Sequence, residues 1–270
     1  MTTALSQVFE RTRSEGRAAL IGYLPAGFPT PEASVELITA MVDAGVDIVE
    51  VGLPYSDPLM DGPDIQAAVD IALRAGTTTD VVLDVVERIS ERGVTNVVMS
   101  YWNPIERFGV ERFAQRLAQA GGSGVITPDL TPEEAGEWIA SSTAHGLDRI
   151  FLVAPSSSDT RIGTVCSVTS GFLYAASTMG VTGARSSVSG AAPVIVDRSR
   201  AVTDLPIAVG LGVSTGDQAR EVAQYADGVI VGSAFVRRIL QADDVPAAVA
   251  SVRELAAELA RGVRGNRGSG

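Results

Sequence analysis

Two acidic residues, Glu50 and Asp61, have the types and positions that best suit proton transfer. Glu50 lies near the end of an otherwise apolar segment, Val46–Val51 (VDIVEV). A carboxylate in such a segment is costly unless it is paired or its pKa is raised, and a raised pKa suits proton transfer near neutral pH. Glu50 is therefore either a general acid–base or a structural residue bonded to backbone or arginine at the rim of the fold.

Asp61 lies in Leu53–Pro63 (LPYSDPLMDGP), a long connection with three prolines and two aspartates. Irregular connections of this length in a compact domain are usually functional. Asp61 before glycine and Asp57 before proline are also typical turn residues, so position alone favours a structural role for each.

Glycine turns in the second half of the chain indicate a phosphate site. Gly180–Gly183 (GVTG), Gly210–Gly212 (GLG) and Gly232-Ser233 each follow an apolar segment. Backbone amides at such turns and at a helix N-terminus bind phosphate without a lysine. Tight strand–helix turns also need small residues, so one glycine turn alone is weak evidence. The three glycine turns together favour a phosphate-binding site.

The composition excludes several classes of chemistry. All 21 basic residues are arginine, which removes lysine Schiff bases, an internal pyridoxal phosphate lysine and a P-loop. His145 is the single histidine and is expected to end a helix, and Cys166 is the single cysteine and is expected in the core. We therefore predict no metal site and no internal disulfide.

The charge and hydropathy patterns bear on partners and location. The net charge is −11, and the chain lacks a basic tract and any apolar run near the roughly 18 residues that span a bilayer. We expect no nucleic-acid or membrane partner, and a cytoplasmic location.

Eight short apolar segments alternate with amphipathic ones, a pattern typical of a parallel sheet buried on both faces. The expected strands are Ala18–Leu24, Val46–Val51, Val94–Ser100, Gly124–Thr127, Asp148–Val153, Phe172–Ala176, Ile207–Gly210 and Gly228–Val231. The expected helices include Pro31–Ala44, Val110–Ala120, Thr131–Ala144, Thr215–Ala226 and Ser233–Leu240. Eight strands favour a single (β/α)8 TIM barrel over residues 1–260 rather than an open doubly wound sheet. An extra helix at Leu5–Glu15 would cover the bottom, and 261–270 is expected to be a disordered tail.

With these residues assembled, nearly the whole chain resembles the α subunit of tryptophan synthase. The motifs are Glu50–Pro58 with Asp61–Pro63, Tyr101–Ile105, Pro128–Leu130 with Pro132–Glu134, and Ser177–Arg185. The resemblance implies a lyase that cleaves indole-3-glycerol phosphate to indole and glyceraldehyde 3-phosphate in tryptophan biosynthesis. It also implies no cofactor in this chain and a β subunit partner that uses pyridoxal phosphate. The two would form an αββα heterotetramer with substrate channelling.

The resemblance also assigns roles to residues. It implies that Glu50 and Asp61 are the catalytic pair. It places next to the substrate, or in the loop over it, Tyr174, Thr182, Tyr23, Met99, Tyr101, Pro128, Leu152 and Leu211. The phosphate ligands would be Gly183, Gly212, Gly232 and Ser233. The contacts with the partner would be Asp57 and Asn103. The family often has phenylalanine where this chain has Tyr23 and Leu211.

Two alternatives within the resemblance are a lyase that works without a partner and an inactive subunit that serves only allosteric binding. Another phosphate-binding barrel of the same pathway is a third. An indole-glycerol phosphate synthase needs a lysine, and a phosphoribosyl isomerase needs a cysteine on the first strand; this chain has neither.

Overall fold

The computed structural model describes residues 3–176, 190–210 and 212–264. Its strands are β1 Ala19–Pro25, β2 Ile48–Gly52, β3 Asn96–Met99, β4 Gly124–Ile126, β5 Asp148–Ile150, β6 Leu152–Val153, β7 Leu173–Ala176, β8 Ile207–Gly210 and β9 Gly228–Val231. Its helices are α1 Ala4–Ser14, α2 Pro31–Asp43, α3 Pro63–Arg74, α4 Thr79–Ser90, α5 Trp102–Phe108, α6 Val110–Gln119, α7 Gly136–Ala144, α8 Asp159–Val168, α9 Ala191–Arg200, α10 Gly216–Ala223, α11 Ser233–Leu240 and α12 Val245–Arg264.

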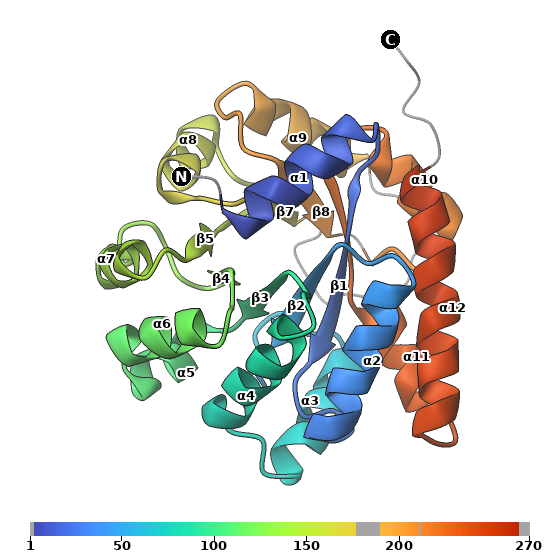
Figure 1. The fold of residues 1–270 in the computed structure, drawn as a ribbon. Coiled ribbons are helices and arrows are strands. Elements are labelled where there is room, and N and C mark those ends of the chain that lie inside the picture. The colour runs from blue at the N-terminus through green and yellow to red at the C-terminus, as the bar shows by residue number, and fades with distance from the viewer. Residues whose placement is uncertain (1–2, 177–189, 211, 265–270) are drawn as a thin grey trace.

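The strands form a nearly closed TIM barrel, as the sequence predicts. Every pair of neighbours is parallel, in the order β5-β4-β3-β2-β1-β9-β8-β7-β6. The two ends of this order, β5 and β6, are successive pieces of one expected strand that Phe151 interrupts. The helices surround the strands (Figure 1).

The barrel interior is filled by side chains from alternate positions of the strands, with α1 beneath them. Ile21, Ile48, Ile126 and Ile150 belong to one buried cluster that also includes Leu5, Val8 and Phe9 of α1. The Phe9 and Phe172 rings pack at a centroid distance of 5.6 Å. The expected N-terminal helix therefore does close the bottom of the barrel, where the strands begin.

Most helix limits agree with the sequence, and α7 is the main exception. The helix expected from Thr131 starts later, and Thr131 and Pro132 instead form a turn in which the Glu134 amide donates to the Thr131 carbonyl. The first helical hydrogen bond runs from the Ile139 amide to the Ala135 carbonyl, so the helix begins at Gly136. Proline is common both in β-turns and in the first turn of a helix, and the sequence pattern does not distinguish the two.

The chain end also departs from expectation. Helix α12 runs to Arg264, so residues 261–264 are helical and not part of a disordered tail. Val263 is buried, and Gly262 lies against the backbone of Gly216 so closely that a Cβ would lie 2.2 Å from its carbonyl oxygen. This contact holds the end of α12 against α10.

Candidate active site

The interior face of the barrel carries five of the predicted site residues in one layer. In a strand, alternate side chains face the same side. Glu50 follows interior Ile48 by two residues, and Tyr23 follows interior Ile21 in the same way. Met99, Leu152 and Tyr174 pack on the same interior cluster. This layer lies toward the C-terminal ends of the strands, where active sites of TIM barrels are found.

Glu50 is a buried carboxyl group on β2. It is 1% exposed, and among the described residues its Oε1 atom has no hydrogen-bond partner. Burial raises the pKa of Glu50 to about 8, because the charged form loses its hydration. Glu50 therefore holds a proton at neutral pH and can donate it to a bound molecule.

Tyr23 and Tyr174 flank Glu50, and two glycines make room for their rings. A Cβ on Gly52 would lie 2.5 Å from the Tyr23 hydroxyl, and one on Gly210 would lie 2.4 Å from the Tyr174 hydroxyl. Burial raises the pKa of each tyrosine, and the Glu50 charge raises both further. The Asp61 charge also raises the pKa of Tyr23, so the charges of both predicted catalytic acids affect the same tyrosine.

Asp61 is held by Tyr101, which follows β3. The Leu59 and Met60 amides donate to the Tyr101 hydroxyl at 3.1 and 2.9 Å, and this hydroxyl donates to Asp61 Oδ1 at 3.4 Å. Burial raises the pKa of Asp61, and the Tyr101 hydrogen bond opposes the shift. Tyr101 was expected only as a pocket residue; its contacts with the Asp61 loop (residues 53–63) could not be read from the sequence.

Three of the predicted phosphate ligands, Gly212, Gly232 and Ser233, lie after the ends of β8 and β9. Gly232 precedes α11, which begins at Ser233, and no side chain within the described part of the chain caps this helix. Its first N–H groups are therefore available to an anion. Gly212 has φ +75°, a conformation that favours glycine. Thr182, Gly183 and Leu211 lie outside the described residues.

An ion pair that the sequence analysis missed joins the two halves of this site. Arg237, one turn after Ser233 on α11, donates to Asp64 Oδ2 at 2.7 and 3.0 Å. Asp64 is in the first turn of α3, three residues after Asp61. The partners are 173 residues apart in the chain, and no local pattern could have paired them.

The remaining predicted residues lie around the mouth of the barrel. Pro128 follows β4 and is half-buried. Asp57 and Asn103 are exposed, as expected for contacts with another chain. Near Asp57, Leu59 is 75% exposed and Met60 43% exposed. The outer surface of the Asp61 loop is therefore apolar as well as acidic.

Other features of the described residues bear on the predicted absences. They contain no group of three or more His, Cys, Asp or Glu side chains that could hold a metal ion. His145 ends α7, as expected, and its Nε2 lies 2.7 Å from Glu111 Oε1. None of the described helices is both long and apolar enough to cross a membrane.

Comparisons with known proteins show the family to which this chain belongs. The family model "Tryptophan synthase alpha chain" matches residues 9–264. The tryptophan synthase alpha chains of Acidothermus cellulolyticus and Thermobifida fusca are 59% and 58% identical to this chain; each match covers 97% of this chain, and 97% and 98% of the relatives.

Solved structures give the same answer. Mycobacterium tuberculosis tryptophan synthase contains a chain that is 54% identical, with a TM-score of 0.92 over 98% of this chain and 99% of that one. The tryptophan synthase subunit alpha of Legionella pneumophila is 31% identical, with a TM-score of 0.87 over 97% and 99%. This chain therefore belongs to the tryptophan synthase alpha chain family, the lyases that carry out the alpha reaction of tryptophan biosynthesis.

Proposed function

We propose that Glu50 and Asp61 together perform the alpha reaction, the cleavage of indole-3-glycerol phosphate to indole and glyceraldehyde 3-phosphate. The observation that carries this proposal is the buried Glu50 carboxyl, whose pKa of about 8 leaves it protonated at neutral pH. A substrate that must be protonated on carbon needs such an acid in a water-poor site.

The reaction is a retro-aldol step in which one proton enters and one leaves. Glu50 donates its proton to C3 of the indole, which gives a cationic indolenine. The bond between C3 and the glycerol carbon then breaks, and its electron pair returns to the ring. The hydroxyl on that carbon becomes the aldehyde and gives its proton to the Glu50 carboxylate, which restores the starting acid.

Asp61 stabilises the positive charge that develops on the indole ring. As a carboxylate it accepts a hydrogen bond from the indole N–H, and this bond strengthens as the ring becomes cationic. The hydrogen bond from Tyr101 favours the charged form of Asp61 and so supports this role. Tyr101 also holds the backbone on the N-terminal side of Asp61 through Leu59 and Met60.

The phosphate of the substrate is bound by Gly183, Gly212, Gly232 and Ser233 in this proposal, with Thr182 orienting Asp61. The pocket for the indole ring would be lined by Tyr23, Met99, Tyr101, Pro128, Leu152, Tyr174 and Leu211. The N–H groups at the start of α11 suit this role because they carry partial positive charge without a lysine.

The wider setting follows from the family. We propose that the β subunit, which carries the pyridoxal phosphate, joins this chain in an αββα heterotetramer in the cytoplasm, with Asp57 and Asn103 at the contact. We also propose that this chain needs no cofactor, because the protonated indole is its own electron sink. Residues 3–264 would then act as one barrel domain.

A non-cleavable indole alkyl phosphate tests this arrangement. A crystal structure and a binding isotherm are expected to show the ring between Glu50 and Asp61 and the phosphate at Gly232 and Ser233. Ser233→Pro would remove one N–H of the cradle and weaken binding about tenfold or more, whereas the control Ser251→Ala on α12 would not. A phosphate bound elsewhere, or acids that point away from the ring, would contradict the proposal.

A further inference from the structure

A cavity lies at the end of the barrel opposite to the predicted active site. It has a volume of about 460 Å³ and lies between the start of α1 and the N-terminal ends of β5, β7 and β8. Its lining includes Thr3 and Ser6 at the start of α1, the apolar Leu205 and Pro206, and two carboxyl groups, Asp148 and Asp204. The other lining residues are Thr169, Ser170, Gly171 and Thr203. We call this the Asp148 cavity.

Asp148 is a buried acid with an unpaired carboxyl oxygen. It is 3% exposed, and among the described residues its Oδ2 atom accepts no hydrogen bond. Burial lowers the pKa of the neighbouring Arg149, and the Asp148 charge opposes this shift, so the two charges interact. The Arg149 guanidinium nevertheless donates its hydrogen bonds to the Ser142 and Thr143 hydroxyls and to the Val168 carbonyl. Burying a carboxyl oxygen without a hydrogen-bond donor is costly.

Two other aspartates at the same end of the barrel show what Asp148 lacks. Asp47, before β2, accepts two hydrogen bonds from Arg17 at 2.6 and 2.8 Å and one from the Leu20 amide at 2.9 Å. Asp227, before β9, accepts from Arg200 at 2.9 Å and from the Ile207 amide at 3.0 Å. Each of these acids has a guanidinium and a backbone amide, whereas Asp148 faces a cavity.

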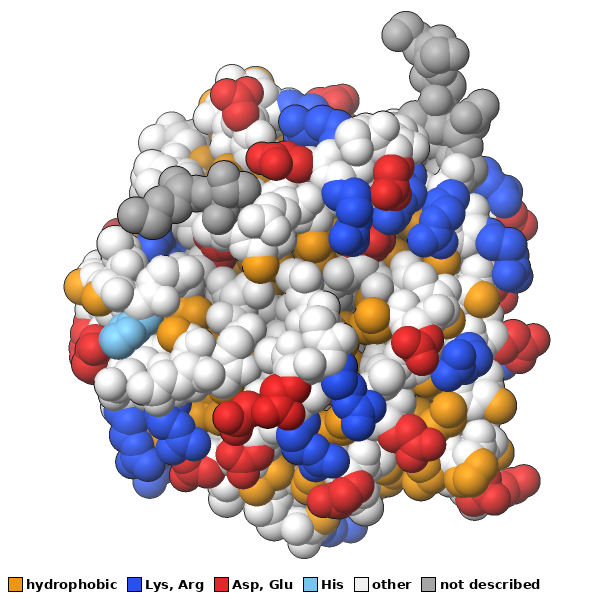
Figure 2. Space-filling model, viewed as in Figure 1, with side chains coloured by type: hydrophobic (Ala, Val, Ile, Leu, Met, Phe, Trp, Pro, Cys, Tyr) orange, Lys and Arg blue, Asp and Glu red, His pale blue; other side chains and the backbone are white. Residues whose placement is uncertain are grey.

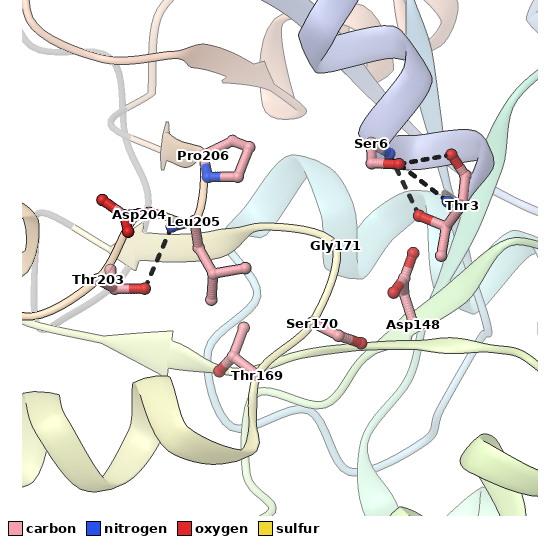
Figure 3. A pocket seen from close by; sticks show the side chains of 10 residues that line it. All are labelled: Thr3, Ser6, Asp148, Thr169, Ser170, Gly171, Thr203, Asp204, Leu205 and Pro206. Carbon is pink, nitrogen blue, oxygen red and sulfur yellow. Dashed lines mark hydrogen bonds between the residues drawn. The ribbon is translucent and has the colours of Figure 1, made fainter. Parts of the chain in front are cut away.

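We propose that the Asp148 cavity binds a small aliphatic diamine. Figure 3 shows Asp148 and Asp204 on opposite sides of the view, with Leu205 and Pro206 between them. One ammonium group would pair with buried Asp148 and the other with exposed Asp204, while the carbon chain would pack on the apolar side chains.

Two further properties favour a diamine. The cavity is much larger than a bare metal ion, so an inorganic cation would not fill it. The net charge of −11 raises the concentration of organic cations near the surface. The Thr3 and Ser6 hydroxyls each accept one backbone N–H in the capping box of α1, and each keeps a second lone pair that could accept from an ammonium group.

Isothermal titration calorimetry with 1,4-diaminobutane tests the proposal. The full chain is expected to bind one diamine, and 1,4-butanediol of the same length is expected not to bind. Asp148→Asn should weaken diamine binding at least tenfold, because it removes the buried charge and keeps the shape. The matched control Glu10→Gln removes an exposed acid of α1 outside the cavity and should bind as the original chain does.

Three results would overturn the proposal: no saturable heat with the diamine, equal binding of the diol, or equal diamine binding by Asp148→Asn and Glu10→Gln. A thermal stabilisation reproduced by sodium chloride at the same ionic strength would also overturn it, because this would show charge screening alone. If Asp148→Asn does not fold, Asp204→Asn provides the second comparison and should weaken diamine binding more than binding of 1-aminobutane.

Discussion

Glu50 combines two properties that rarely occur together, full burial and an unpaired carboxyl oxygen. Its neighbours on β2 are apolar, so strand formation buries it whether or not it has a partner. The cost of burying the charge appears as a pKa of about 8. The residue is therefore less favourable for stability than an apolar side chain would be, and the proposed proton transfer is the role that accounts for it.

The pKa of Glu50 predicts how stability depends on pH. The carboxyl has a pKa of 4.5 when unfolded and about 8 when folded, so the folded state binds more protons between these values. Its contribution to the free energy of unfolding is therefore fully present below pH 4.5 and falls as the pH rises to 8, by at most about 5 kcal/mol. Glu50→Gln should remove this fall and make the free chain more stable at pH 8.

Urea unfolding of both proteins at pH 5 and pH 8 measures this difference. Glu36→Gln, an exposed acid of α2, is a suitable control and should leave the fall unchanged. If Glu50→Gln lost as much stability as the original chain between the two pH values, the raised pKa would be wrong.

At the residue scale the sequence identified candidate site residues, but not their contacts. An acid in an apolar segment is visible in the sequence, and Glu50 was found in this way. Asp61 looked like a turn residue until the resemblance assigned it. Its partner Tyr101 lies 40 positions away, and only the barrel brings them within hydrogen-bond distance.

At the scale of elements, the Asp61 loop is held from two sides. Tyr101, after β3, binds its backbone, and Arg237 on α11 binds Asp64 just beyond it. The helix proposed to bind phosphate is therefore tied by an ion pair to the segment that carries Asp61. Movement of either element would alter the position of the other.

Breaking this ion pair should affect turnover more than substrate binding. Arg237→Gln is expected to lower kcat for indole release about fivefold, the equivalent of roughly 1 kcal/mol for a half-buried pair, while KM changes less. The charge-swapped pair Arg237→Asp with Asp64→Arg should recover part of the loss. Steady-state kinetics with the β subunit present measures both constants.

The matched control for this test is Arg238→Gln, the next residue of α11, whose guanidinium lies 3.8 Å from Glu254 on the outer side. A loss of kcat equal in both variants would show a general effect on the helix rather than a link to Asp61.

The helices and strands were predictable where the hydrophobic periodicity and the residues typical of element ends agree. Helix α2 has both an N-cap, Thr30, and a proline at its first position, and it begins where expected. Helix α7 had the same local signal at Thr131 and Pro132, yet begins at Gly136. The signal identifies a chain reversal, and tertiary packing decides whether helix or turn follows.

For the whole molecule, the barrel separates two ends with different properties. The C-terminal ends of the strands carry Glu50, the Asp61 loop and the start of α11, and the other end carries α1 and the Asp148 cavity. On the face shown in Figure 2, arginine and acidic side chains are interspersed, and hydrophobic side chains show between them. A barrel was predictable because eight buried strands in alternation with helices have few other solutions.

The exposed surface of the Asp61 loop predicts a contact with the β subunit. Leu59 and Met60 are exposed apolar side chains next to exposed Asp57, a combination that suits an interface. Asp57→Arg is expected to weaken the complex tenfold or more, as measured by calorimetric titration of this chain with the β subunit. Asp84→Arg, the same change at an exposed position of α4, should leave the affinity unchanged; equal losses would contradict this location.

The most direct test of the account is the rate of indole release from indole-3-glycerol phosphate by Glu50→Gln, with the β subunit present. The amide keeps the shape of the side chain and cannot donate and recover a proton as the acid does, so kcat should fall at least a hundredfold. A variant that folds, binds the β subunit and releases indole at the original rate would contradict the central role of Glu50.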